Sequence, residues 1–142
     1  GQGMGYDSLK SLLQLDLEAI DFAANGGTNF AQLELLRSAP VKQQIFSQLA
    51  RVGHSAAEMV AMTNQLQAEL GSKLRCKQII ISGGIQNFLD GYYLMNQLQL
   101  NCVYGQASAF LRHARGNYNE LRTYVRSQVE GLELANALLR IK

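Results

Sequence analysis

The sequence lacks the features that mark several classes of protein. It has no tryptophan, one proline and two cysteines, and only 17% of its 142 residues are charged. No apolar run is long enough to cross a bilayer, so we expect no membrane contact. The net charge is +2, and the basic residues are scattered rather than interleaved with aromatics as in a nucleic-acid track. The composition, 47% hydrophobic, is typical of a single globular domain, here residues 1–142.

Cysteine and metal motifs are equally sparse. Cys76 and Cys102 form no CxxC pattern and lie in or beside predicted strands, where a free cysteine acts as a small hydrophobe. With no secretory or transit signature, this pattern indicates a reducing, cytoplasmic setting. The sequence contains no HExxH, no metal-ligand cluster, no nucleophile–base pair and no convincingly spaced pair of carboxylates. We therefore predict no catalytic residue and no metal site on this chain.

A strand–glycine–helix turn, in contrast, occurs three times. The apolar run 79–81 leads directly into residues 82–84 (Ser-Gly-Gly), and a helical pattern follows. Similar turns stand at residues 25–28 (Asn-Gly-Gly-Thr) and 105–108 (Gly-Gln-Ala-Ser). Glycine permits a positive φ and the close approach of another molecule, while the free N–H groups of a helix start favour an anion. One such turn is a weak signal, but three together predict a phosphate-bearing small molecule as partner.

The order of elements is that of an α/β protein. Apolar strands that alternate with helices are expected to be parallel and covered by those helices. Ligands then bind at the carboxyl ends of the strands, where all three turns fall. The predicted strands cover residues 17–24, 79–81 and 101–104. The predicted helices are one from about Asp7, one that ends before Pro40, one over 41–52, a capping-box helix from Ser55 to Gly71, one over 88–98 and a short segment through Phe110 and Leu111. A last helix follows a cap at Asn117, and its apolar residues from Leu121 to Leu139 predict one buried face.

Three polar residues near the turns carry weaker signals. His54 precedes a helix cap and is best interpreted as a surface residue. His113 stands between Arg112 and Arg115, where a solvated basic turn is favoured over a phosphate contact. Asp21 lies inside an apolar strand, so we expect it to have a buried partner or to face the rim of the sheet.

Six segments of the chain also form a recognisable series. They are Gly-Gln-Gly-Met at 1–4, Ile-Asp at 20–21, Gly-Gly-Thr at 26–28, Glu…Arg at 34–37, Ser-Gly-Gly-Ile at 82–85 with Asp90, and Gly…Ala-Ser-Ala-Phe-Leu at 105–111. In this order they resemble the flavin-dependent type 2 isopentenyl-diphosphate isomerases over nearly the whole chain. Only the Ser-Gly-Gly element is generic to FMN-binding barrels.

The resemblance implies a partial (β/α)8 TIM barrel, of which this chain is the C-terminal half with parallel strands and extra helices. It implies a portion of an enzyme that interconverts isopentenyl and dimethylallyl diphosphates with FMN and, in the complete protein, NADPH and Mg2+. It places Thr28 near the flavin. It also implies that the flavin phosphate is held by backbone N–H groups of Gly83, Gly84, Ile85, Ala107 and Ser108.

Two departures from the family qualify this interpretation. Gln86 stands where the family usually has an arginine, which removes a charge-assisted contact to phosphate. A complete barrel needs about 250 residues, and the family's catalytic lysine, glutamine and magnesium-binding glutamate precede its G-x-G-M loop. We therefore expect a piece of a longer protein, inactive by itself.

The residues leave two alternatives open. The chain could be an inert phosphate- or flavin-binding fragment, or part of another FMN-dependent barrel oxidoreductase. The second alternative needs a base such as histidine, and neither His54 nor His113 is placed at a strand end. In every case a half-barrel has two open sheet edges and a wet inner face, which predicts self-association.

Overall fold

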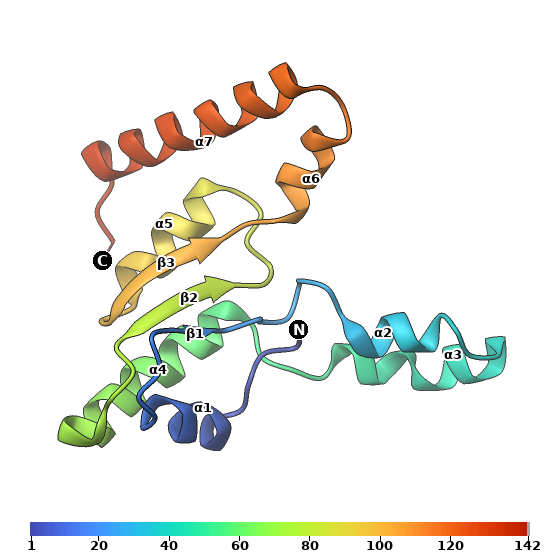
Figure 1. Ribbon diagram of the computed structural model, residues 1–142, viewed down its shortest axis with the longest axis horizontal. Coiled ribbons are helices and arrows are strands. Elements are labelled where there is room, and N and C mark those ends of the chain that lie inside the picture. The colour runs from blue at the N-terminus through green and yellow to red at the C-terminus, as the bar shows by residue number, and fades with distance from the viewer. Residues whose placement is uncertain (142) are drawn as a thin grey trace.

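Three parallel strands form the centre of the molecule, and helices joined by loops surround them (Figure 1). The structure, a computed structural model, describes residues 1–141. Its α-helices are α1 (Tyr6–Leu13), α2 (Phe30–Leu35), α3 (Pro40–Phe46), α4 (Ala56–Leu70), α5 (Phe88–Gln97), α6 (Ser108–Ala114) and α7 (Tyr118–Leu138), with short 3-10 helices η1 (Ser47–Arg51) and η2 (Gly71–Lys73) and strands β1 (Ile20–Asp21), β2 (Gln78–Ser82) and β3 (Asn101–Gly105). The fold is therefore α/β, as the sequence predicts, and is consistent with part of a barrel.

The register of the sheet separates two faces. The strand order is β1-β2-β3, with Ile79 opposite both Ile20 and Cys102, and Ile80 opposite Asp21 and Val103. Because side chains alternate along a strand, the first row faces one side and the second row the other. Ile79 and Ile81 are 1% and 0% exposed, whereas Val103 in the second row is 59% exposed. One face is thus covered, and the other is open.

Helices α1, α4 and α5 supply the cover. The core they form with β2 consists mainly of leucine and isoleucine side chains; its largest fully buried members are Phe22, Leu9, Leu13, Met59, Leu66, Ile79 and Ile81. Gly91 of α5 permits the closest approach, since a Cβ there would lie 2.5 Å from the ring of Tyr104 on β3. Burial of this apolar surface is the main stabilising term of the fold.

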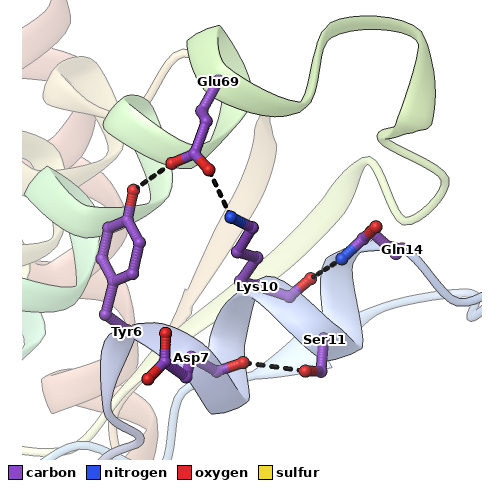
Figure 2. Close-up of polar contacts among 6 residues, drawn as sticks. All are labelled: Tyr6, Asp7, Lys10, Ser11, Gln14 and Glu69. Atoms are coloured by element: carbon purple, nitrogen blue, oxygen red, sulfur yellow. Dashed lines mark hydrogen bonds and ion pairs between the residues drawn. The ribbon is translucent and has the colours of Figure 1, made fainter.

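A polar contact fixes α1 against α4 (Figure 2). Glu69 of α4 accepts a hydrogen bond from the Tyr6 hydroxyl at 2.5 Å and forms an ion pair with Lys10, both on α1. The hydrogen bonds from Lys10 and Tyr6 lower the pKa of the Glu69 carboxyl, because they stabilise its charged form. The same contact raises the pKa of the Tyr6 hydroxyl.

The segment from α2 through η1, residues 30–51, is here named the arm. It extends away from the sheet (Figure 1), and none of its helices contains a buried residue. Its base is fixed by polar contacts: Asn29 Nδ2 donates to the Ala50 carbonyl at 2.6 Å, and Gln2 Nε2 donates to the Leu49 carbonyl at 3.0 Å. The arm is therefore attached without an apolar core of its own.

Three sequence predictions need correction. The strand predicted over 17–24 is reduced to Ile20–Asp21. Before it, the Leu17 N–H closes a tight turn onto Leu15 O (3.0 Å), and after it the positive φ of Ala23 interrupts the extended backbone. The helix predicted over 41–52 begins at Pro40 and ends at Phe46, where the Ser47 hydroxyl donates to the Gln44 carbonyl at 2.9 Å and competes with the helical backbone.

The last helix is the third correction. Its predicted buried face is mostly uncovered: only Gly131 and Ala135 of α7 are buried, while Val125 and Val129 are exposed. Helix α7 packs on α5 at Gly131, where a Cβ would lie 2.5 Å from the Phe88 ring. Within residues 1–141, no helix has the length and apolar character needed to span a bilayer.

Candidate functional site

The three glycine turns meet at one cavity. It has a volume of about 1220 Å3 and lies at the carboxyl ends of the three strands. All six residues predicted to bind a flavin phosphate line it: Thr28, Gly83, Gly84, Ile85, Ala107 and Ser108. The structure therefore brings together residues that are 80 positions apart in the chain, as expected when parallel strands end at one edge of a sheet. Their role in binding stays a prediction.

The turns after β1 and β2 pack against each other. Gly83 and Gly84 have φ values of 93° and 77°, and Gly26 has a φ of 101°, a region that favours glycine. A Cβ on Gly83 would collide with the backbone of Ala24, and one on Gly26 would lie 2.7 Å from the Cα of Gly84. These glycines are thus required by the neighbouring turn, an origin different from the ligand approach that the sequence suggested.

Backbone donors are nevertheless free at this rim. Among the residues that the structure describes, the N–H groups of Gly84 and Ile85, which follow the last paired position of β2, donate no hydrogen bond. The N–H groups of Ala107 and Ser108 on the opposite side are likewise without an acceptor. N–H groups without acceptors that line one cavity suit an anion. The rim therefore fits the phosphate of a bound molecule.

The start of α5 does not add to these donors. Two N–H groups of its first turn are occupied, since Asn87 Oδ1 accepts from Leu89 N (2.9 Å) and from Asp90 N (3.1 Å). Asp90 in turn accepts from the Gln86 N–H at 3.0 Å. The expectation that the N–H groups of this helix start are free is therefore wrong for Leu89 and Asp90. The available donors belong to the glycine turn itself.

Polar side chains line the side of the cavity between β3 and α7, here named the polar wall. Gln106 Nε2 donates to the Tyr124 hydroxyl at 3.0 Å and to the Gln86 carbonyl, and the His113 ring stacks on Tyr124 with centroids 4.3 Å apart. The amide oxygens of Gln106 and Gln128 are buried without a hydrogen-bond partner. A buried acceptor without a donor is unfavourable, so this wall fits a bound water or a ligand that carries hydroxyl or N–H groups.

Sequence reasoning identified only part of this wall. Gln106 lies inside one of the three turns, but Tyr124 and Gln128 were missed because their one-turn spacing on α7 carries no signal of a ligand. Arg112 and His113 of α6 line the cavity, so the basic segment lies at the site. The phosphate contact considered for His113 stays untested.

The remaining candidates lie at the edge of the site. Asp21 is exposed and accepts hydrogen bonds from the Ala23 N–H (3.0 Å) and from the Ser82 hydroxyl, so the predicted position at the rim is confirmed. His54 is half-buried, and its backbone pairs with Gln2 and Asn25, both at 2.8 Å. No group of three or more His, Cys, Asp or Glu residues within 1–141 is arranged to hold a metal ion.

Comparison with known proteins finds relatives of low identity. A protein of Ignicoccus hospitalis named isopentenyl-diphosphate delta-isomerase is 26% identical over 135 residues, which are 94% of this chain and 36% of that protein. Proteins of the same name from Rickettsia felis (24% over 135 residues, 94% of this chain and 36% of that protein) and Bacillus licheniformis (34% over 90 residues, 63% and 23%) also match. This chain thus spans 36% of the length of the first two. No protein-family model matches it, and no solved structure matches it significantly.

Proposed function

We propose that this chain is the C-terminal portion of an FMN-dependent type 2 isopentenyl-diphosphate isomerase and that it supplies the loops that hold the flavin phosphate. The observation that carries the proposal is the meeting of three glycine turns at one cavity at the strand ends, with free N–H groups in the turns after β2 and β3. The similarity over 94% of the chain to proteins of this name supports the same assignment.

In the proposed function, the chain's own residues bind and orient. The N–H groups of Gly83, Gly84, Ile85, Ala107 and Ser108 would hold the phosphate, and Thr28 would lie along the flavin. Gln106 and Gln128 offer acceptor oxygens to hydroxyl groups of the ribityl chain. Bound and reduced, FMN would supply the proton transfer between the two isomeric diphosphates, with NADPH and Mg2+ needed by the complete enzyme.

The proposal predicts binding without turnover for this chain alone. The family's catalytic groups precede the segment that resembles residues 1–4, so we expect FMN to bind and isopentenyl diphosphate to remain unchanged. The alternative of an inert fragment differs in one respect, because it predicts a folded chain that does not retain flavin.

Gel filtration distinguishes these outcomes. The chain is mixed with FMN, with riboflavin as the control that lacks the phosphate, and the absorbance of flavin near 450 nm is followed in the protein peak. We expect FMN to co-elute with the folded chain and riboflavin to separate from it. Equal retention of both would contradict a phosphate site, and retention of neither by a folded chain would favour the inert fragment.

Activity requires the upstream half. We expect that adding residues equivalent to the upstream part of a relative, in one chain, gives conversion of isopentenyl to dimethylallyl diphosphate with reduced FMN and Mg2+. A folded, flavin-loaded hybrid without this conversion would contradict the isomerase assignment and leave the phosphate site intact.

A further inference from the structure

One residue at the rim has an unusual backbone. Ala23 has a φ of 43°, and it is the only non-glycine residue with a positive φ among those that the structure describes. An L-residue in this left-handed region is unfavourable by about 1–2 kcal/mol relative to its ordinary conformations. Surrounding contacts must therefore hold it there, and residues held in this way cluster at functional sites.

The contacts that hold Ala23 come from two strands. Its N–H donates to Asp21 Oδ1 at 3.0 Å on β1 and to Ser82 Oγ at 3.1 Å on β2. The Ser82 hydroxyl donates to the same Asp21 oxygen, which orients the serine so that its lone pairs face Ala23. The Ala23 carbonyl accepts from the Gly3 N–H at 2.9 Å. One carboxylate oxygen is thus common to the contacts that fix this residue.

The conformation of Ala23 determines where the next turn lies. Immediately after it, the Ala24 N–H donates to the Ser82 carbonyl at 2.9 Å, and the Ala24 backbone occupies the space that a Cβ on Gly83 would need. A different φ at Ala23 would move Ala24 away from Gly83 and separate the two turns. Ala23 and Ser82 line the cavity, whereas Asp21 is not among its lining residues.

We propose that Asp21 is a positioning residue of this rim: with Ser82 it holds Ala23 in the left-handed conformation and so sets the relative position of the turns that would bind the phosphate. The part of this statement that concerns phosphate rests on the proposed function. The part that concerns Ala23 is independent of any ligand.

Four variants test the proposal. Asp21→Ala removes the shared acceptor, whereas Asp21→Asn removes the charge and keeps an oxygen at the same place. A glycine at position 23 adopts a positive φ without strain, so the double variant D21A/A23G should keep this conformation without the Asp21 carboxylate. In the ligand-free chain, the intraresidue amide–Hα NOE of residue 23 reports a positive φ by its high intensity.

The expected pattern is specific. We expect a strong NOE in the unaltered chain and in D21N, and a weak one in D21A. FMN affinity should fall about tenfold in D21A, the factor that corresponds to the cost of holding Ala23 in the left-handed conformation without the Asp21 carboxylate. It should stay within about twofold of the unaltered chain in D21N and in D21A/A23G. If the D21A variant does not fold but the D21A/A23G variant does, the proposal is supported equally.

Three outcomes would overturn it. A strong NOE with unchanged FMN affinity in D21A would show that Ala23 needs no support from Asp21. An equal loss of FMN affinity in D21A and D21N would show that the charge of Asp21 acts rather than its geometry. If adding A23G to D21A did not restore FMN affinity, Ala23 would be excluded as the residue through which Asp21 acts. If the unaltered chain binds no FMN, only the proposed function fails, since the NOE comparison on the ligand-free chain still decides the role of Asp21.

Discussion

The covered face of the sheet and the arm contain similar apolar residues in opposite environments. Ile79 and Ile81 are almost wholly buried under α1, α4 and α5, whereas Phe30 and Ile45 of the arm are 69% and 62% exposed. Both segments are rich in large apolar residues. The difference teaches that apolar residues in an element indicate a face that can be covered, while the presence of the covering partner depends on the rest of the fold.

Truncation of the covered face should have the largest effect. We expect Ile81→Ala to lower the free energy of unfolding by about 2–5 kcal/mol, because it leaves a cavity in a closely packed core. Val103→Ala on the open face is the matched control and should change it by less than about 1 kcal/mol. Urea denaturation of both variants measures the difference, and equal losses would contradict the division of the sheet into two faces.

The rim where the covered sheet ends should be the next most sensitive region. We expect Gly83→Ala to destabilise the chain and to weaken FMN binding more than tenfold, since its Cβ collides with the backbone of Ala24. Gly71→Ala is the matched control: Gly71 also has a positive φ, of 51°, but nothing lies within 4 Å of its Cβ position. Denaturation and flavin-fluorescence titration give both quantities. An equal loss of FMN affinity in the two variants would contradict the role of the packed turns.

Much of this architecture could be predicted because it is fixed locally. The Ser55–Glu58 capping box, the Asn117 cap and the apolar run before Gly83 are each determined by residues within a few positions of one another, and each is confirmed. The wrong boundaries have non-local or competing causes. The strand expected from residue 17 pairs only from Ile20 onward, and the face of α7 that was expected to be buried is fully buried only at Gly131 and Ala135.

The candidate site likewise has features that the local sequence predicts and features that it does not. The positions of the glycine turns follow from the sequence, because parallel strands bring their carboxyl ends to one edge. That Asn87 occupies the N–H groups of α5, or that Gln128 reaches the cavity from α7, depends on tertiary packing that the spacing of the residues does not reveal.

Polar substitutions in the arm should leave the fold unchanged and alter association. We expect the free energy of unfolding of a triple variant, Phe30→Ser, Val41→Ser and Ile45→Ser, to lie within about 0.5 kcal/mol of that of the unaltered chain, since none of these side chains is buried. We propose that the exposed arm and the open sheet edges drive self-association, so sedimentation velocity should show smaller species for the variant. A rigid monomer before substitution would contradict this proposal, whereas a large loss of stability would show that the arm belongs to the core.

The smallest expected effect concerns the contact between α1 and α4. Because the folded chain lowers the pKa of Glu69, this carboxylate contributes stability above its usual pKa of about 4.3 and loses it as the pH falls through the lowered value. The contribution is small, since the group is exposed to solvent. Carboxyl 13C NMR should give a pKa below the usual range, and Lys10→Met should raise it. Titration at the usual value in the unaltered chain would contradict the contact in Figure 2.

The central claim, that the turns after β2 and β3 form one phosphate site, is tested most directly by amide NMR during titration with FMN and with riboflavin. FMN should shift the resonances of Gly83, Gly84, Ile85, Ala107 and Ser108 together, with one dissociation constant, and riboflavin should leave them nearly unchanged. Shifts elsewhere with these five resonances unmoved, or the same shifts with both flavins, would contradict the claim.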